Sequence, residues 1–184
     1  MKKVLVPLAP GFEEIEAITV IDILRRAGVE VTVAGTKPGA IEASRKTRHL
    51  PDCGLDDALT RTDEFDMIVL PGGQPGTNNL RADPRIKTLI ERLRARNKII
   101  AAICAAPTVL SAYGVLKGKR ATCHPGSRAQ LAAGEVVNDR VVVDGPVITS
   151  QSAGTAMEFA FKLVELLCGA EKAAEVNQGV QARL

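Results

Sequence analysis

The 184-residue sequence has no tryptophan, one tyrosine and only 3% aromatic residues. Its net charge is +3, and its basic residues alternate with acidic ones instead of forming a stripe. Nucleic-acid-binding surfaces usually combine a basic patch with aromatic side chains on which bases stack. Nucleic acid is therefore not expected as a direct partner.

Long hydrophobic runs are also absent. No apolar stretch approaches the roughly 20 residues that a membrane-spanning helix needs. Lys2 and Lys3 lead directly into a strand-like segment, with no apolar signal-peptide core or small-residue cleavage site. We expect a cytoplasmic protein that has no membrane partner.

Cysteine pairs at metal-binding spacing are missing too. The four cysteines, at positions 53, 104, 123 and 168, are far apart and form no CxxC motif. This spacing predicts neither a zinc site nor a redox dithiol, and in a reducing compartment all four should be free thiols. No metal and no organic cofactor is expected.

The composition that remains is typical of a globular protein, with 46% hydrophobic and 24% charged residues. A chain of this length can bury a sizeable core without disulfides. We therefore expect one domain spanning residues 1–184.

Short apolar runs alternate with helical patterns along the chain. In the first helical pattern, apolar residues recur every three positions from Ile15 to Leu24, and Gly28 ends it. Alternating strands and helices predict an α/β fold, a three-layer sandwich with a mostly parallel sheet. The predicted strands are 4–8, 29–34, 65–70, 98–103 and 147–149, and the predicted helices are 13–27, 84–96, 154–167 and a short one ending near 113. Pieces at 120–124, 136–137 and 141–143 continue the sheet or decorate it, and 170–176 adds a helical turn or two.

In such sheets, ligands bind at the carboxyl ends of the parallel strands. Four segments meet this description: 9–16, 71–73, 104–106 and the stretch near His124. Reactive side chains lie in three of them.

Cys104 directly follows a buried strand and precedes a helix start, with alanines two residues away on both sides. This pattern is typical of a nucleophile elbow, whose sharp turn excludes larger flanking side chains. Amides at a helix N-terminus would favour the thiolate. The alternative is a buried cysteine that acts only as a small hydrophobic residue.

The glycine pair Gly72 and Gly73 follows its own strand. Glycines let the backbone approach a ligand and direct N–H groups at a developing oxyanion. A tight turn that needs positive φ explains the pair equally well.

Three carboxylates, Glu13, Glu14 and Glu16, begin the first helix. If these carboxylates are exposed, stabilisation by the helix dipole is enough to explain their presence. A carboxyl pointing into a cleft beside a thiolate would instead have a raised pKa and would stay protonated as an acid. Periodicity does not decide which glutamate does this.

Of the two histidines, His49 lies in a polar basic stretch, whereas His124 follows a strand-like run and precedes Pro125. His124 is the better candidate for a base, although a histidine in such a place is more often structural.

The chain resembles the DJ-1/ThiJ/PfpI superfamily, in particular the DJ-1-like branch that includes the bacterial YajL-type proteins. The resemblance covers nearly the whole length and is carried by residues 8–16, 25–28, 69–73, 101–107, 122–125 and 149–155.

This resemblance implies a fold of the flavodoxin-like or class I glutamine amidotransferase-like type and a homodimer to which the first helix contributes. It implies that Cys104 is the easily oxidised nucleophile and that Glu16 is the protonated acid beside it. The oxyanion site would be formed by the backbone amides of Gly73, in the Gly72-Gly73 turn, and of Ala105, directly after the cysteine. His124 would contact the pocket without forming the cysteine–histidine pair of PfpI-type proteases, because Ala105 follows the cysteine, so peptidase activity is not expected.

Two activities are compatible with the resemblance. The first is a glyoxalase-like or deglycase-like enzyme that acts on α-oxoaldehydes such as methylglyoxal or on early glycation adducts, nucleic acid being a partner only as a glycated substrate. The second is a redox-sensing stress-response protein or chaperone whose Cys104 is oxidised to a sulfinate without turnover. Cys123 is expected to pack rather than react.

Overall fold

The computed structural model describes residues 1–184 and centres on a seven-stranded sheet in the order β10-β11-β7-β6-β1-β2-β5. Only the edge strand β10 is antiparallel to its neighbour; all the other neighbouring strands are parallel. The strands are β1 Lys3–Leu8, β2 Glu30–Gly35, β5 Cys53–Gly54, β6 Met67–Leu70, β7 Ile99–Ile103, β10 Val141–Asp144 and β11 Val147–Ser150. Because the parallel strands share a direction, their carboxyl ends meet at one edge of the sheet.

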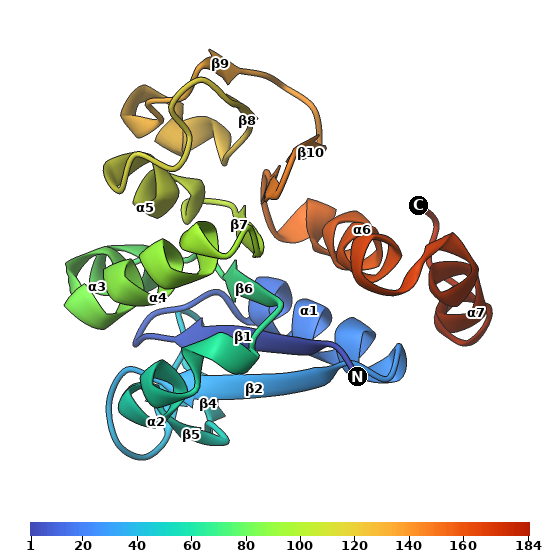
Figure 1. Ribbon diagram of the computed structural model, residues 1–184, viewed down its shortest axis with the longest axis horizontal. Coiled ribbons are helices and arrows are strands. Elements are labelled where there is room, and N and C mark those ends of the chain that lie inside the picture. Colours follow the sequence, from blue (N-terminus) through green and yellow to red (C-terminus); the bar gives the residue numbers. More distant parts are fainter.

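Helices cover both faces of this sheet (Figure 1). One face carries α1 Glu14–Arg26, α6 Ala156–Cys168 and α7 Ala170–Val180. The other carries α2 Leu55–Thr60, α3 Gly76–Ala82, α4 Pro84–Ala95 and α5 Pro107–Ala112. The predicted three-layer α/β fold with a mostly parallel sheet is therefore confirmed.

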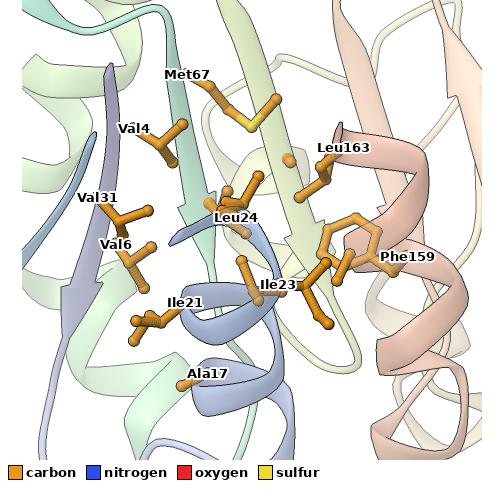
Figure 2. Close-up of a cluster of buried hydrophobic side chains, with 14 of the residues drawn as sticks. Val4, Val6, Ala17, Ile21, Ile23, Leu24, Val31, Met67, Phe159 and Leu163 are labelled. Carbon is orange, nitrogen blue, oxygen red and sulfur yellow. The ribbon is translucent and has the colours of Figure 1, made fainter. Parts of the chain in front are cut away.

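Alternation of side chains along the strands builds a core on each face. Val4 and Val6 of β1 point toward α1 and α6, whereas Leu5 points toward the opposite layer. Figure 2 shows the first of these cores, where Leu24 of α1 and Phe159 of α6 pack over the strands. Strands buried on both faces explain why the sequence reads as short continuous apolar runs.

The remaining elements are small. A two-stranded hairpin joins β3 Ile41–Glu42 to β4 Arg48–His49, and a second pair joins β8 Arg120–Ala121 to β9 Glu135–Val136. Three 3-10 helices, Thr62–Glu64, Pro125–Gln130 and Ala153–Thr155, complete the chain. No helix combines the length and apolar character needed to cross a membrane.

The piece at 120–124, expected to continue the sheet or to decorate it, decorates it. Only Arg120 and Ala121 form a strand, and it pairs with β9 outside the main sheet. His124 therefore does not follow a strand of the central sheet. Ala121, Thr122 and Cys123 are all fully buried although they lie outside the main sheet.

Helix α1 begins and ends close to its predicted limits, but its buried face differs from the predicted stripe. Ile15 is 56% exposed and Ile18 is 38% exposed, whereas Ala17, Val20 and Leu24 are buried. The buried positions follow the i, i+3, i+7 spacing of one helix face. Two large apolar side chains of α1 therefore remain on the surface.

Replacing Phe159 by alanine should lower the free energy of unfolding by about 3–5 kcal/mol, because the fully buried ring fills the space between α1 and the sheet. Urea denaturation measures the change. Leu166→Ala, on the exposed side of the same helix, is the matched control and should change it by less than about 0.5 kcal/mol. Equal losses in the two variants would contradict the assignment.

Candidate active site

Cys104 lies at the carboxyl end of β7, where the chain turns sharply into α5. Its φ is 65°, a left-handed conformation that is uncommon for a residue other than glycine. Its N–H donates to the carbonyl of Ser150 at 3.0 Å, and its own carbonyl accepts from the N–H of His124 at 2.8 Å. The predicted elbow is present, held by hydrogen bonds from both sides.

Gly72 brings the cysteine and a carboxyl group together. A Cβ added at Gly72 would lie 2.6 Å from Cys104 Cβ and 2.6 Å from Glu16 Oε2. The N–H of Gly72 donates to Glu16 Oε2 at 2.9 Å. This amide therefore holds the carboxyl group, which differs from its expected place in the oxyanion site.

Gly73 permits a second close approach at the same turn. Its φ is +88°, and an added Cβ would lie 2.5 Å from the backbone nitrogen of Glu13. Burial and Glu16 raise the pKa of the Cys104 thiol, and the nearby backbone amides of Gly73 and Ala105 offset part of that rise. These two amides thus face the sulfur, as an oxyanion site would require.

Glu16 is a buried acid, with 1% of its surface exposed. Its Oε1 atom is buried and receives no hydrogen bond from any N–H or O–H group. Burial raises the pKa of the Glu16 carboxyl to about 7, against the smaller lowering effects of Cys104 and the Gly72 amide. The side chain can therefore hold or release a proton near neutral pH.

The Cys104 thiol and the Glu16 carboxyl titrate as a pair. Burial, followed by the negative charge of Glu16, raises the pKa of the Cys104 thiol to about 12. Two groups that interact this strongly share their protons, so the pair carries one negative charge once the first proton has left. The thiolate forms when the remaining proton resides on Glu16. The helix N-terminus alone does not produce a thiolate, since α5 has only six residues and starts at Pro107.

The three glutamates at the start of α1 have three different partners. Glu13 Oε2 accepts the N–H of Glu16 at 2.8 Å and so caps the helix. Glu14 Oε1 accepts the N–H of Arg45 at 2.7 Å, and Glu14 Oε2 accepts the hydroxyl of Ser44 at 3.1 Å. Of the three, Glu16 is the one whose carboxyl group interacts with the Cys104 thiol.

His124 lines the pocket but does not contact the sulfur by a hydrogen bond. Its side chain is exposed, and its Nδ1 accepts the N–H of Gly126 at 3.1 Å. This bond leaves Nε2 as the N–H side of a neutral ring. Nε2 can therefore donate to a bound molecule, while the backbone N–H of His124 helps to fix the elbow at Cys104.

A pocket of about 260 Å³ opens over Cys104. Of the predicted site residues, Gly73, Ala105 and His124 line it with Cys104, whereas Glu16 and Gly72 lie behind its wall. It is also lined by four polar side chains that sequence reasoning missed: Ser44, Arg45, Gln74 and Ser127. Ser44 and Arg45 belong to the β3–β4 connection, which is remote in sequence from Cys104. The one available signal was the polar run at 44–48, which does not indicate where it folds. No cluster of three or more histidine, cysteine or acidic side chains is placed to hold a metal ion.

The other cysteines lie away from this pocket. Cys123 is fully buried, burial raises the pKa of its thiol, and its sulfur faces the carbonyl of His124 at 3.3 Å. Cys53 is half-buried, and Cys168 is exposed on the surface. The packing role expected for Cys123 agrees with this burial.

The fold and the site together define an α/β protein with a strand-end cysteine set against a buried carboxyl group. The chain belongs to the DJ-1/PfpI family, whose profile matches residues 2–166. It is 47% identical to protein dj-1beta of Drosophila melanogaster, over 97% of this chain and 96% of that protein. It is 40% identical to the glutathione-independent glyoxalase DJR-1.2 of Caenorhabditis elegans, over 93% of this chain and 91% of that protein.

Solved structures agree. The crystal structure of Drosophila melanogaster DJ-1beta superposes with a TM-score of 0.95 at 44% identity, covering 100% of this chain and 99% of that one. Oxidized Toxoplasma gondii DJ-1 superposes with a TM-score of 0.95 at 35% identity, covering both chains fully. The resemblance inferred from the sequence is confirmed.

The rate at which iodoacetamide alkylates Cys104 should rise with pH around a midpoint near 7, because the pair loses its first proton there. In Glu16→Gln the midpoint should move to higher pH, since the buried thiol must then ionise without a neighbouring carboxyl to take its proton. Intact mass and peptide mapping measure the rate, with the exposed Cys168 as internal reference. An unchanged midpoint in Glu16→Gln would show that the two groups are not coupled.

Proposed function

We propose that the protein is a cysteine-dependent enzyme that isomerises and hydrates small α-oxoaldehydes, converting methylglyoxal to lactate without a cofactor. The observation that carries this proposal is the arrangement at Cys104, whose sulfur faces two backbone amides and a buried carboxyl group in a small pocket. The 40% identity with a protein named a glutathione-independent glyoxalase supports it.

In the first step, the Cys104 thiolate adds to the aldehyde carbon. A sulfur–carbon bond forms, and the aldehyde oxygen gains the negative charge. The amides of Gly73 and Ala105 stabilise this oxyanion as it forms, and the proton held by Glu16 neutralises it. The product is a hemithioacetal, and Glu16 is left as a carboxylate.

In the second step, the Glu16 carboxylate removes the proton on the former aldehyde carbon while the neighbouring ketone oxygen gains a proton, which gives an enediol. A proton then adds to the former ketone carbon, and the hydroxyl on the first carbon gives up its proton as the thioester carbonyl forms. The first carbon is thereby oxidised to a thioester and the second is reduced to an alcohol, so no external oxidant is required. Water then breaks the sulfur–carbon bond, giving lactate and free Cys104. His124 is the second group available to carry a proton. Its Nδ1 accepts the N–H of Gly126, so Nε2 is the atom that can do so.

We extend the proposal to early glycation adducts. In these adducts the former aldehyde carbon is bonded to a thiol, an amine or a nucleotide base. The pocket is open to solvent beside exposed His124, so an adduct on a larger molecule can present its small end to Cys104. Peptidase chemistry receives no support, because Ala105 follows the cysteine and no imidazole hydrogen-bonds the sulfur.

The second candidate function is redox sensing. The same two amides and the Glu16 acid would stabilise a sulfinate formed on Cys104, and a family member of known structure is described as oxidized. This candidate requires no turnover.

We also propose a homodimer that uses α1. Ile15 and Ile18 are exposed on α1 and line a hollow of about 590 Å³ together with Met157 of α6 and Val180 of α7. An apolar hollow of this kind is typical of a protein interface. Glu14 lines it as well, and the same side chain holds Arg45, so the pocket of Cys104 lies close to the proposed interface.

Cys104→Ala should abolish lactate formation from methylglyoxal, and Glu16→Gln should reduce it by about a hundredfold or more, because the proton transfers lose their carrier. Lactate is measured enzymatically on protein freed of contaminating glyoxalases. Cys168→Ala, which removes an exposed thiol, is the matched control and should retain full activity. Equal lactate formation by wild type and Cys104→Ala would refute the proposal, whereas no lactate, with Cys104 oxidised by peroxide before the other thiols, would favour the sensor.

Ile18→Glu should convert the dimer to a monomer, because it places a charge in the apolar hollow on α1. Size-exclusion chromatography with light scattering measures the mass. Val136→Glu introduces the same charge at a comparably exposed apolar position on β9 and should leave the dimer intact. A monomeric wild type would refute the dimer, and a dimer that persists in Ile18→Glu would place the interface elsewhere.

A further inference from the structure

Arg45 stands apart from the basic residues around it. It lines the pocket over Cys104, and none of the ion pairs of the chain includes its guanidinium group. By contrast, Lys46 and Arg48 both pair with Glu42, at 3.1 and 3.3 Å. Among three neighbouring basic side chains, the one that reaches the pocket is the one that lacks an acidic partner.

The backbone that carries Arg45 is firmly placed. The N–H of Arg45 donates to Glu14 Oε1 at 2.7 Å, and the hydroxyl of Ser44 donates to Glu14 Oε2 at 3.1 Å. The N–H of Ser44 donates to the carbonyl of Phe12 at 2.8 Å. Charge-assisted bonds of this kind are about twice as strong as neutral ones. The loop therefore presents Arg45 from a fixed base on α1.

The charge of the pocket depends on Arg45. It is the only lysine or arginine among the residues that line it. Glu13 is the one acidic side chain that lines the pocket; its Oε2 accepts the N–H of Glu16, and its negative charge acts beside the positive charge of Arg45. Gln74 and Ser127 add neutral polar groups. An unpaired guanidinium beside neutral donors is a suitable receptor for a carboxylate.

We propose that Arg45 is a specificity-determining residue that selects electrophiles bearing a carboxylate close to the carbon that Cys104 attacks. In the reaction proposed above, on which this assignment of substrate rests, the preferred substrates are small carbonyl compounds that carry a carboxylate. The same contact would hold the carboxylate of the hydroxy-acid product.

Two alkylating reagents that differ only in charge test this without turnover. Iodoacetate and iodoacetamide both react by displacement: the sulfur–carbon bond forms, the carbon–iodine bond breaks, and iodide leaves with the electron pair. The ratio of their rates at Cys104, measured by mass spectrometry of the mapped peptides, reports the charge preference of the pocket. In wild type this ratio should exceed the ratio at exposed Cys168 of the same chain.

In Arg45→Met the ratio at Cys104 should fall by up to about fivefold, as expected for one exposed charge contact. Arg45→Lys should retain most of the preference, and Arg48→Met, whose arginine pairs with Glu42, should leave it unchanged. Added salt should lower the wild-type ratio toward that of Arg45→Met. The iodoacetamide rate itself reports whether a variant keeps the elbow at Cys104. If this rate changes in Arg45→Met, the charge preference is judged from Arg45→Lys and from the salt dependence of the wild type.

An unchanged ratio in Arg45→Met, an equal fall in Arg48→Met, or a wild-type ratio that does not respond to salt would overturn the role of Arg45. These results are independent of lactate formation. A charge preference without lactate would overturn the proposed reaction and leave the carboxylate receptor, and lactate without a charge preference would do the reverse.

Discussion

The contact between a buried carboxyl group and a thiol, made possible by the absence of a side chain at Gly72, is the constraint on which the site depends. Any Cβ at this position would overlap both Cys104 and Glu16. The Gly72 amide then holds one carboxyl oxygen and leaves the other without an N–H or O–H donor. An uncompensated oxygen in a buried place favours the protonated acid, and that in turn is what allows the sulfur to carry the charge.

The surrounding fold supplies rigidity for this contact. Glu16 comes from the buried side of α1, the same side whose apolar residues pack in the core over the sheet. Cys104 comes from the end of β7, hydrogen-bonded to β11 and to the loop of His124. The left-handed backbone of Cys104 is a strained conformation, and such strain persists only where neighbouring structure holds it. The sheet and its two helical layers provide that support.

Much of the fold was predictable from the sequence, because strands buried on both faces read as short apolar runs between helical patterns. The elbow at Cys104 and the turn at Gly72 and Gly73 were visible for the same reason. The choice of Glu16 over Glu13 and Glu14 was not accessible to periodicity, since all three lie at the start of one helix and the partners of Glu14 and Glu16 are remote in sequence. Arg45 was missed because its place depends on a tether to Glu14. Whether the piece at 120–124 continues the sheet or decorates it could not be decided, because residues buried outside a sheet are as apolar as those inside it.

The first turn of α1 carries several tasks on adjacent residues. Glu13 caps the helix, Glu14 tethers the loop of Arg45, Ile15 is exposed on the surface, and Glu16 faces the cysteine. Successive residues of a helix are rotated by about 100°. A single insertion or deletion in this turn would therefore turn every one of these side chains toward its neighbour's place at once. The segment can tolerate exchange of one side chain for another far better than it can tolerate any change in length.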